Sequence, residues 1–521
     1  MSNAQKDQLF LLINSLSKAE KRNFRLYATR NQSGKDAKFV QLFDALDKLD
    51  DFDEQAVLKK LPAVKKQHLP NLKRHLYRQI LTSLRLIHIQ KNIDIQIREQ
   101  IDFARILYGK GMYMQSLRIL DRIKQIAIEH HQDLLHLEIL EFQKLIEARH
   151  VTRSRAVEHK MDVLLGESET RCTVTYYSNL LSNLNIKIHG WYIDRGHARS
   201  AAEKDEIKAF LDQHYPEHLH VTTRKETFFE RVNLNQIYLW FHYINQDFLR
   251  AEEQAKQWVN QFFRNTQMQE KDPDLYMRGL YYLLVFLFIN QDKKEHAYYL
   301  DQFVEYVEDA DSYLNTNSRM VASFYLNLSR INHLLLNGNY KGADKLIPGI
   351  EEEIDLYQHH ADRYRVLLFY YKFAWIKFAL GEFDKAQDYL NEIVLVKNDV
   401  LREELYYFAR VLQLLCFYEN NDYDVMAYNL TSLRRSMGRS HHTDKLLQTT
   451  TSFLKKICET PESESLELFQ QLGQELDKQK HKPDNQKSLI YLNTPLWVKS
   501  RIKGCTISDI CETESLTVSG C

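Results

Sequence analysis

Apolar and polar positions follow a repeating order over most of this chain, and that order predicts pairs of helices joined by short turns. The chain has seven helix breaks, and an apolar residue stands twelve positions after every one of them. Nine positions after the break, the residue is apolar in six of the seven cases. An aromatic residue stands three residues before six of the breaks. Apolar residues three or four apart share one face of a helix, so each break is expected to join two amphipathic helices. The breaks are at Gly111, Arg195, Gln246, Gln291, Gly338, Gly381 and Asn421.

The breaks are spaced 84, 51, 45, 47, 43 and 40 residues apart. The first interval fits two units of 42, which places a further turn near residues 150–156. We therefore expect about eight helix pairs over residues 95–435. In such an array each pair buries its apolar face only against its neighbours, which is typical of a right-handed α-solenoid.

Composition agrees with an all-α fold. The chain has 521 residues with 15 Gly and 8 Pro, and 44% of its residues are apolar. The alternation of apolar and polar residues that strands need is missing, so we expect almost no sheet. The formal net charge of zero hides an uneven distribution, because residues 1–91 hold 18 Lys or Arg against 9 Asp or Glu. The first segment is therefore +9 and residues 92–521 are −9.

This charge division predicts a small basic N-terminal helical domain over residues 1–94, built from four helices. Ser17 and Glu20 form a capping-box signal, Pro62 ends a helix and Pro70 suits the first turn of the next. Two helices over residues 436–480 should cap the repeats. Residues 481–521 lose the periodicity and carry Pro, Gly, Ser and Thr, so we expect a mostly disordered tail.

The turn residues resemble the tetratricopeptide repeat. Gly381-Glu382-Phe383-Asp384-Lys385-Ala386, with Ala374 seven residues before the Gly, is similar to that family's signature of a small residue, then Gly, an acidic residue, an aromatic and Ala. Residues 338–343 and 246–251 are similar matches. The resemblance implies that the position five residues after the turn permits close approach of the paired helices. That position holds Ser116, Ser200, Ala251, His296, Ala343, Ala386 and Met426. The period of 40 to 51 residues is longer than the family's usual 34.

The resemblance also implies a concave groove that holds a partner peptide or domain. Positions three and six residues before the turn face that groove in the family, which places Trp240 with Tyr243, and Trp375 with Phe378, along one channel. Rigid aromatic side chains are common binding anchors. The alternative is that these four residues form the core between repeats, because aromatic stripes at helical spacing often pack inward.

A basic face is expected on the helix that begins at Pro70. No acidic residue occurs between Gln55 and Ile93. Lys73, Arg74, Arg78 and Arg85 are candidate contacts for nucleic acid or another anion, since clustered cations can follow a phosphate backbone. A solvated surface, or a dock for the acidic repeat region, would give the same pattern.

Other classes of function find little support. Paired histidines at residues 130–131, 359–360 and 441–442 point about 100° apart on a helix, and the spacing of Cys505, Cys511 and Cys521 matches no standard zinc site. We expect no metal, no cofactor and no catalytic residues. The N-terminus lacks the features of a signal peptide, and the most apolar window is too short for a membrane span, so we expect a cytoplasmic protein. The sequence thus predicts a non-catalytic scaffold that binds a protein or peptide, with a nucleic-acid-binding regulator as the alternative. It leaves the partner and the oligomeric state open.

Overall fold

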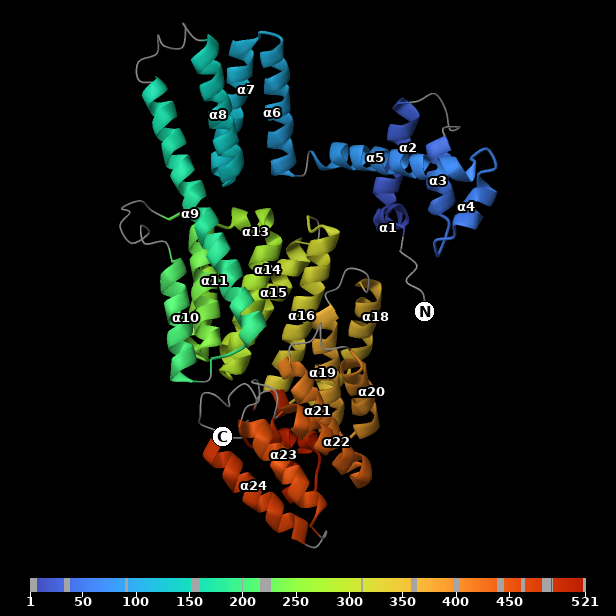
Figure 1. Cartoon of the computed structure of the whole chain (residues 1–521), viewed down its shortest axis with the longest axis vertical. Helices are drawn as coiled ribbons and strands as arrows, with labels where there is room; N and C mark the ends of the chain where they lie inside the picture. Colours follow the sequence, from blue (N-terminus) through green and yellow to red (C-terminus); the bar gives the residue numbers. More distant parts are fainter. Residues whose placement is uncertain are drawn as a thin grey trace. The chain divides into compact units, whose positions relative to one another are not determined.

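The computed structural model consists mainly of α-helices (Figure 1). It describes residues 7–31, 38–89, 92–150, 160–198, 200–215, 226–310, 313–357, 363–396, 403–437, 445–460, 464–479, 489 and 491–518. No residue in these ranges lies in a β-strand, which confirms the all-α prediction.

The chain divides into two compact units, residues 1–175 and residues 176–521. The division falls inside one helix of 36 residues, α9 (Lys160–Arg195). Unit 1 contains two separate core clusters, one between Leu9 and Ile80 and the other between Ile97 and Ile146. The predicted boundary at residue 94 falls between these two clusters.

Unit 1 begins with five helices and a short 3-10 turn, which we call the head. They are α1 (Gln8–Ser15), α2 (Lys18–Asn31), α3 (Lys38–Leu46), α4 (Glu54–Lys60), η1 (Lys66–His68) and α5 (Leu69–His88). The sequence predicted four helices and missed α1, whose N-terminus is capped by Asp7. Pro70 lies in the first turn of α5, as predicted, because a proline there loses no intrahelical hydrogen bond.

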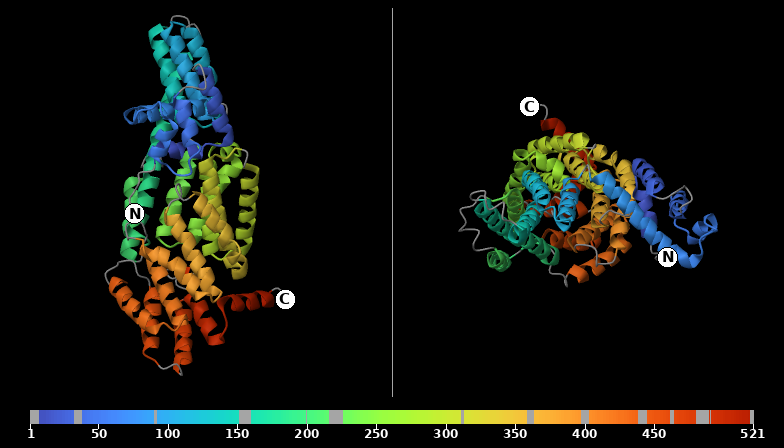
Figure 2. Two further views of the ribbon diagram at one scale, coloured as in Figure 1. Left: turned by 90° about the vertical axis from the view of Figure 1, so that its right-hand side faces the viewer. Right: turned by 90° about the horizontal axis from the view of Figure 1, so that it is seen from above.

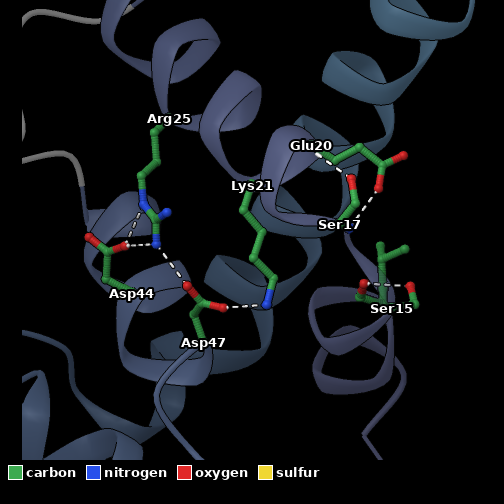
Figure 3. A network of polar contacts seen from close by, with 8 residues as sticks. Ser15, Ser17, Glu20, Lys21, Arg25, Asp44 and Asp47 are labelled. Carbon is green, nitrogen blue, oxygen red and sulfur yellow. Dashed lines mark hydrogen bonds and ion pairs between the residues drawn. The ribbon is translucent and has the colours of Figure 1, made fainter.

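The head also shows the predicted capping box (Figure 3). The backbone N–H of Ser17 donates to Glu20 Oε2 at 2.8 Å, and the backbone N–H of Glu20 donates to Ser17 Oγ at 3.2 Å. In the same view, Arg25 reaches Asp44 at 2.9 Å and Asp47 at 2.7 Å. Asp47 also pairs with Lys21 at 2.7 Å, and these cations keep the pKa of Asp47 below its usual value despite partial burial. Two basic side chains of the head therefore serve its internal structure.

The remaining helices of unit 1 are α6 (Ile93–Gly109), α7 (Tyr113–Glu129) and α8 (Asp133–His150), followed by the start of α9. The turn expected near residues 150–156 lies outside the described residues, except for His150 at the end of α8. Beyond it, α9 runs unbroken as far as the predicted break at Arg195.

Unit 2 continues from the second half of α9 with helices that are mostly paired. The first are α10 (Ala201–His214), α11 (Phe228–Ile244), α12 (Phe248–Arg264), α13 (Gln267–Lys271), α14 (Pro273–Ile289), α15 (Lys293–Ala310) and α16 (Thr316–Leu336). They are followed by α17 (Tyr340–Asp344), α18 (Ile347–Tyr357), α19 (Arg363–Ala379), α20 (Phe383–Val394), α21 (Glu403–Glu419) and α22 (Tyr423–Met437). We call residues 228–437, from α11 to α22, the pair region. Next come the two predicted capping helices, α23 (Lys445–Cys458) and α24 (Ser465–Gln479).

Six of the seven predicted breaks are left-handed turn residues, with φ between 60° and 82°. Each ends its helix in a Schellman motif, in which two backbone N–H groups return to carbonyls of the last turn. At Gly381, for example, the N–H of Gly381 donates to Phe378 O at 3.0 Å and that of Glu382 to Lys377 O at 2.9 Å. The seventh prediction was one residue early, because the left-handed residue is Gly196 and not Arg195. The sequence also missed a Schellman turn at His131, between α7 and α8.

Side chains after the turns are buried as their periodicity predicts. All seven residues twelve positions after the breaks are buried, among them Trp258 and Phe303. Five positions after the breaks, six of the seven residues have no exposed surface: Ser116, Ala251, His296, Ala343, Ala386 and Met426. The seventh, Ser200, caps α10. Small side chains are therefore not the only ones that this position accepts.

Helices of the pair region pack mainly against near neighbours in the sequence. The helix before each turn contacts its partner after the turn, as in α11 with α12 and α19 with α20. From α14 onward it also contacts the first helix of the following pair, as in α14 with α16 and α16 with α19. Figure 1 shows these helices side by side.

The C-terminal residues differ from the expected disordered tail. They form α26 (Thr494–Lys503) and α27 (Ile507–Val518), drawn in red in Figure 2. Pro495 lies in the first turn of α26, and Gly504 ends it with a φ of 67°. The same residue types that suggested disorder are thus start and stop signals of a helix. Trp497 of α26 is 1% exposed, so burial of a large aromatic ring holds this segment in place.

Candidate partner-binding site

The four aromatic residues expected in a groove lie mostly in the core. Trp240 and Tyr243 belong to α11, and Trp375 and Phe378 belong to α19. Trp240, Trp375 and Phe378 are only 6%, 5% and 3% exposed, and Tyr243 is half-buried. Side chains with so little accessible surface have little left to offer a partner, so the packing alternative describes these three better than the groove alternative.

These residues also do not share one channel. Trp240 packs against His189, with ring centres 4.3 Å apart, within a cluster formed by α9 to α16. Trp375 stacks on Phe378 at 5.8 Å in a different cluster, which extends from α17 to the C-terminal helices. Of the four predicted residues, Trp375 alone lines the cavity described next.

A cavity of about 770 Å³ lies between the pair region and the C-terminal helices. Two successive turns, at Gln291 and Gly338, and Trp375 of α19 contribute one wall, which includes Phe288 and Leu335. The opposite wall comes from α24 and α26 and includes Leu496, Val498, Ile502, Lys499 and Lys503. The cavity combines apolar side chains with the charged Lys499, Lys503 and Asp477. Its size lies within the range of small-molecule and peptide side-chain sites.

A buried lysine lies near this cavity. Lys372 of α19 is 9% exposed, and burial lowers its pKa to about 8. Its Nζ lies 5.2 Å from the ring centre of Phe288 and 5.9 Å from that of Tyr491. Aromatic faces attract a cation but compensate its desolvation less well than a carboxylate does. No carboxylate is found within ion-pair distance of Lys372 among the described residues.

Residues 489 and 491–518, which we call the C-terminal segment, lie against the pair region. The Tyr371 hydroxyl donates to the backbone carbonyl of Tyr491 at 3.0 Å, across 120 residues of sequence. The ring of Tyr491 stacks on Phe408 with centres 5.5 Å apart and planes 15° apart. The pair region thus binds a piece of chain through a main-chain hydrogen bond and an aromatic stack.

Glu419 anchors α26 to the end of α21. Trp497 Nε1 donates to Glu419 Oε1 at 2.7 Å, and Arg501 reaches Oε2 at 3.1 Å. Burial raises the pKa of Glu419, and these two hydrogen bonds act in the opposite direction because they favour the charged form. The Trp497 ring also contacts Tyr418 and Phe469 at 5.9 and 5.3 Å. Trp497 is therefore part of the core.

The sequence pattern missed a second aromatic group in the pair region. Tyr281 of α14 stacks on Tyr325 of α16, with ring centres 4.3 Å apart and planes 11° apart. Arg365 of α19 lies 4.8 Å above Tyr325 and donates to its hydroxyl at 3.0 Å. These residues stand at unequal distances from their turns, so no repeating signal marks them in the sequence.

The predicted basic residues of α5 have different surroundings. Lys73 pairs with Asp7 at 2.7 Å, with both side chains less than one-fifth exposed, and is therefore a structural residue of the head. Arg85 lies 3.6 Å from Asp102. Arg74 and Arg78 are exposed, and neither has an ion pair with any residue that the structure describes. The exposed Tyr77 and Leu81 lie on the same stretch of helix.

The described residues include neither a cluster of metal ligands nor a membrane-spanning helix. No group of three or more His, Cys, Asp or Glu side chains there is arranged to hold a metal ion. Within the same ranges, no helix combines the length and apolar character needed to cross a bilayer. Comparison with models of protein families, with curated proteins and with solved structures found no significant match.

Proposed function

We propose that this protein is a non-catalytic cytoplasmic scaffold that binds a protein or peptide through its helix pairs. In this proposal the pairs stack as a right-handed α-solenoid of about eight tetratricopeptide-like units. The Schellman turns and the contacts between successive pairs support such a stack, since repeat proteins bury their apolar faces against neighbouring repeats.

The proposed binding function rests on one observation: the C-terminal segment packs against the pair region. Its contacts combine a hydrogen bond to the main chain of Tyr491, an aromatic stack on Phe408 and an ion pair between Lys341 and Glu512 at 2.9 Å. Grooves that recognise peptides use the same three kinds of contact. A surface that binds a segment of its own chain in this way is suited to bind one from another protein.

The cavity beside Trp375 is the proposed binding position. Its walls offer apolar area for a partner's aliphatic or aromatic side chain. Trp375 and Trp240 form a matched pair for testing this, because both are almost fully buried tryptophans and only Trp375 lines the cavity.

The test is a selection of peptides from a random display library on the immobilised full chain. Enriched peptides are then titrated by fluorescence anisotropy against wild type, Trp375→Ala and Trp240→Ala. Binding that falls at least tenfold in Trp375→Ala and stays near wild type in Trp240→Ala is expected. Circular dichroism shows whether both variants keep their helices. Failure to enrich any peptide above an albumin control would contradict the proposal. Equal losses of peptide affinity in the two variants would show that the cavity is not the binding position.

The alternative is a nucleic-acid-binding regulator, and the exposed Arg74 and Arg78 favour it. Binding to phosphates should weaken steeply with salt, because each contact releases a counterion. The full chain would be titrated against random duplex DNA and single-stranded RNA at low and moderate salt, next to Arg74→Glu/Arg78→Glu. Salt-dependent binding that the double variant loses would support this function. The absence of binding at low salt would exclude it.

A further inference from the structure

Helix α27 lies over two successive turns of the pair region. A Cβ atom placed on Gly338 would come within 2.8 Å of Cys511 Cβ, and one on Gly381 would lie 3.5 Å from Thr506 Cγ2. The Tyr340 hydroxyl and the Cys511 thiol are also hydrogen-bonded. The chain therefore packs a helix directly on a glycine turn, at a distance that other residues would not allow at Gly338.

Helix α27 carries two buried aliphatic side chains near its start and one paired carboxylate in its middle. Ile507 and Ile510 are 2% exposed, and Glu512 pairs with Lys341 at 2.9 Å. A reciprocal cap between Thr506 and Asp509, with both bonds at 3.2 Å, fixes where the helix begins. This helix thus brings its own start signal, two apolar anchors and one carboxylate.

The attachment of α27 contrasts with that of α26. Trp497 holds α26 in the core through several rings and Glu419. In α27 the charged contact is open to solvent, since the side chains of Lys341 and Glu512 are 60% and 44% exposed. Ion pairs between exposed side chains contribute little to stability. Residues 504–506, which begin with the left-handed Gly504, separate α27 from α26.

Of the turns in the pair region, these two are the most open to such an approach. Those at Gln246, Gln291 and Asn421 carry side chains, whereas Gly338 and Gly381 carry none. The two glycine turns are consecutive along the chain, and α27 together with the preceding Thr506 reaches both. The surface formed by Gly338, Gly381 and Lys341 is called the glycine-turn dock below.

We propose that the glycine-turn dock binds an amphipathic helix of a partner protein, one with two aliphatic anchors and a carboxylate, and that α27 occupies the dock until that helix replaces it. The inference rests on the proposed scaffold function and specifies its partner chemistry and regulation. The partner helix has the spacing of Ile507, Ile510 and Glu512, because α27 with that spacing buries both isoleucines and pairs with Lys341.

The first measurement uses the full chain and the variant Ile507→Asp/Ile510→Asp, which disrupts the apolar face of α27. Release is followed by the alkylation rate of Cys511, resolved by peptide mass spectrometry. Binding is followed by anisotropy of a fluorescent peptide with the sequence of residues 504–518, in reducing buffer. We expect alkylation at least tenfold faster in the variant, and peptide binding at least tenfold tighter than to wild type.

A charge exchange tests the role of Lys341. Adding Lys341→Glu to the variant should weaken the peptide about fivefold, and a peptide with Glu512→Lys should recover that loss. If Cys511 is released but the peptide binds no more tightly, the dock does not accept a helix and the proposal is overturned. It is likewise overturned if Cys511 stays protected in Ile507→Asp/Ile510→Asp, or if wild type is a dimer whose Cys511 loses protection on dilution.

A second variant keeps the test decisive if the double variant does not fold. Gly338→Ala places a methyl group against Cys511, whereas Gly111→Ala has a similar φ, 76° against 71°, and open space around it. Both variants carry the same left-handed strain, so faster alkylation of Cys511 is expected in Gly338→Ala alone. Equal rates in the two would contradict the proposal.

The outcomes also separate this inference from the scaffold function. If library peptides bind but the peptide of residues 504–518 does not, the scaffold function is supported and the glycine-turn dock is excluded as a binding site. If the peptide of residues 504–518 binds but no library peptide does, the dock is only an internal contact of this chain and the scaffold function is excluded.

Discussion

Acidification should destabilise unit 2 through its buried histidines, and His296 has a larger fall in pKa than His242 and His333. His296 of α15 has no exposed surface, and its Nδ1 lies 3.3 Å from Nδ1 of His333. Burial, with a smaller contribution from His333, lowers the pKa of His296 from 6.5 to about 4. The unfolded chain therefore takes up a proton at a higher pH than the folded one. The stability that the neutral His296 contributes is fully present above pH 6.5 and is lost progressively as the pH falls towards 4.

The size of the effect follows from the two pKa values. At pH 5 the unfolded histidine is almost fully protonated and the folded one is mostly neutral. Linkage then gives a loss of about 2 kcal/mol in the free energy of unfolding relative to pH 7.5. The loss belongs to unit 2, because His296 lies within residues 176–521.

Urea unfolding followed by tryptophan fluorescence at pH 7.5 and pH 5 measures this difference. All five tryptophans lie in residues 176–521, so the signal reports unit 2. His296→Ala should be less stable at both pH values, and the difference between them should shrink by about 2 kcal/mol. The lowered pKa values of His242 and His333 leave a smaller pH dependence in this variant. Met426→Ala is the matched control, since Met426 is equally buried five residues after another turn and does not titrate. An unchanged pH difference in His296→Ala would show that protonation of His296 does not cause the loss of stability at pH 5.

Three further changes have expected outcomes. Gln291→Gly should raise the stability of unit 2 by about 1 kcal/mol in the same urea assay, because Gln291 has a left-handed φ of 61° that glycine adopts without strain. Trp497→Ala should cost about 3–5 kcal/mol and Trp497→Phe about 1–2, since phenylalanine keeps the ring contacts but leaves Glu419 without one donor. Lys73→Met should destabilise the head by about 2 kcal/mol, seen as faster hydrogen exchange in α1 and α5, because Asp7 loses its partner. A Lys73→Met chain with unchanged exchange would show that the pair is dispensable.

The turns could be predicted from the sequence because their requirements are local. A Schellman motif needs one left-handed residue and carbonyls from the preceding turn, so Gly338 and Gly381 mark it by themselves. After α9 the left-handed residue is Gly196 and not Arg195, so the glycine itself marks the turn more accurately than the repeat spacing does. The capping box at Ser17 and Glu20 was predictable for the same reason, since it lies within four residues.

The site could not be predicted because it depends on long-range packing. Periodicity showed that Trp240 and Trp375 share a face with their neighbours, but it could not show what covers that face. Trp497 packs beside Glu419, 78 residues earlier, and no local pattern connects them. The Pro and Gly content of the last residues suggested disorder, whereas burial of Trp497 supplies the contacts that order them.

Hydrogen–deuterium exchange of the full chain, with and without a library-selected peptide, tests the scaffold function most directly. We expect slower exchange in the turns and helices around the cavity, over residues 286–292, 335–341 and 371–378, and faster exchange in α27. Protection confined to the head, or no change in the pair region at saturating peptide, would contradict the scaffold function.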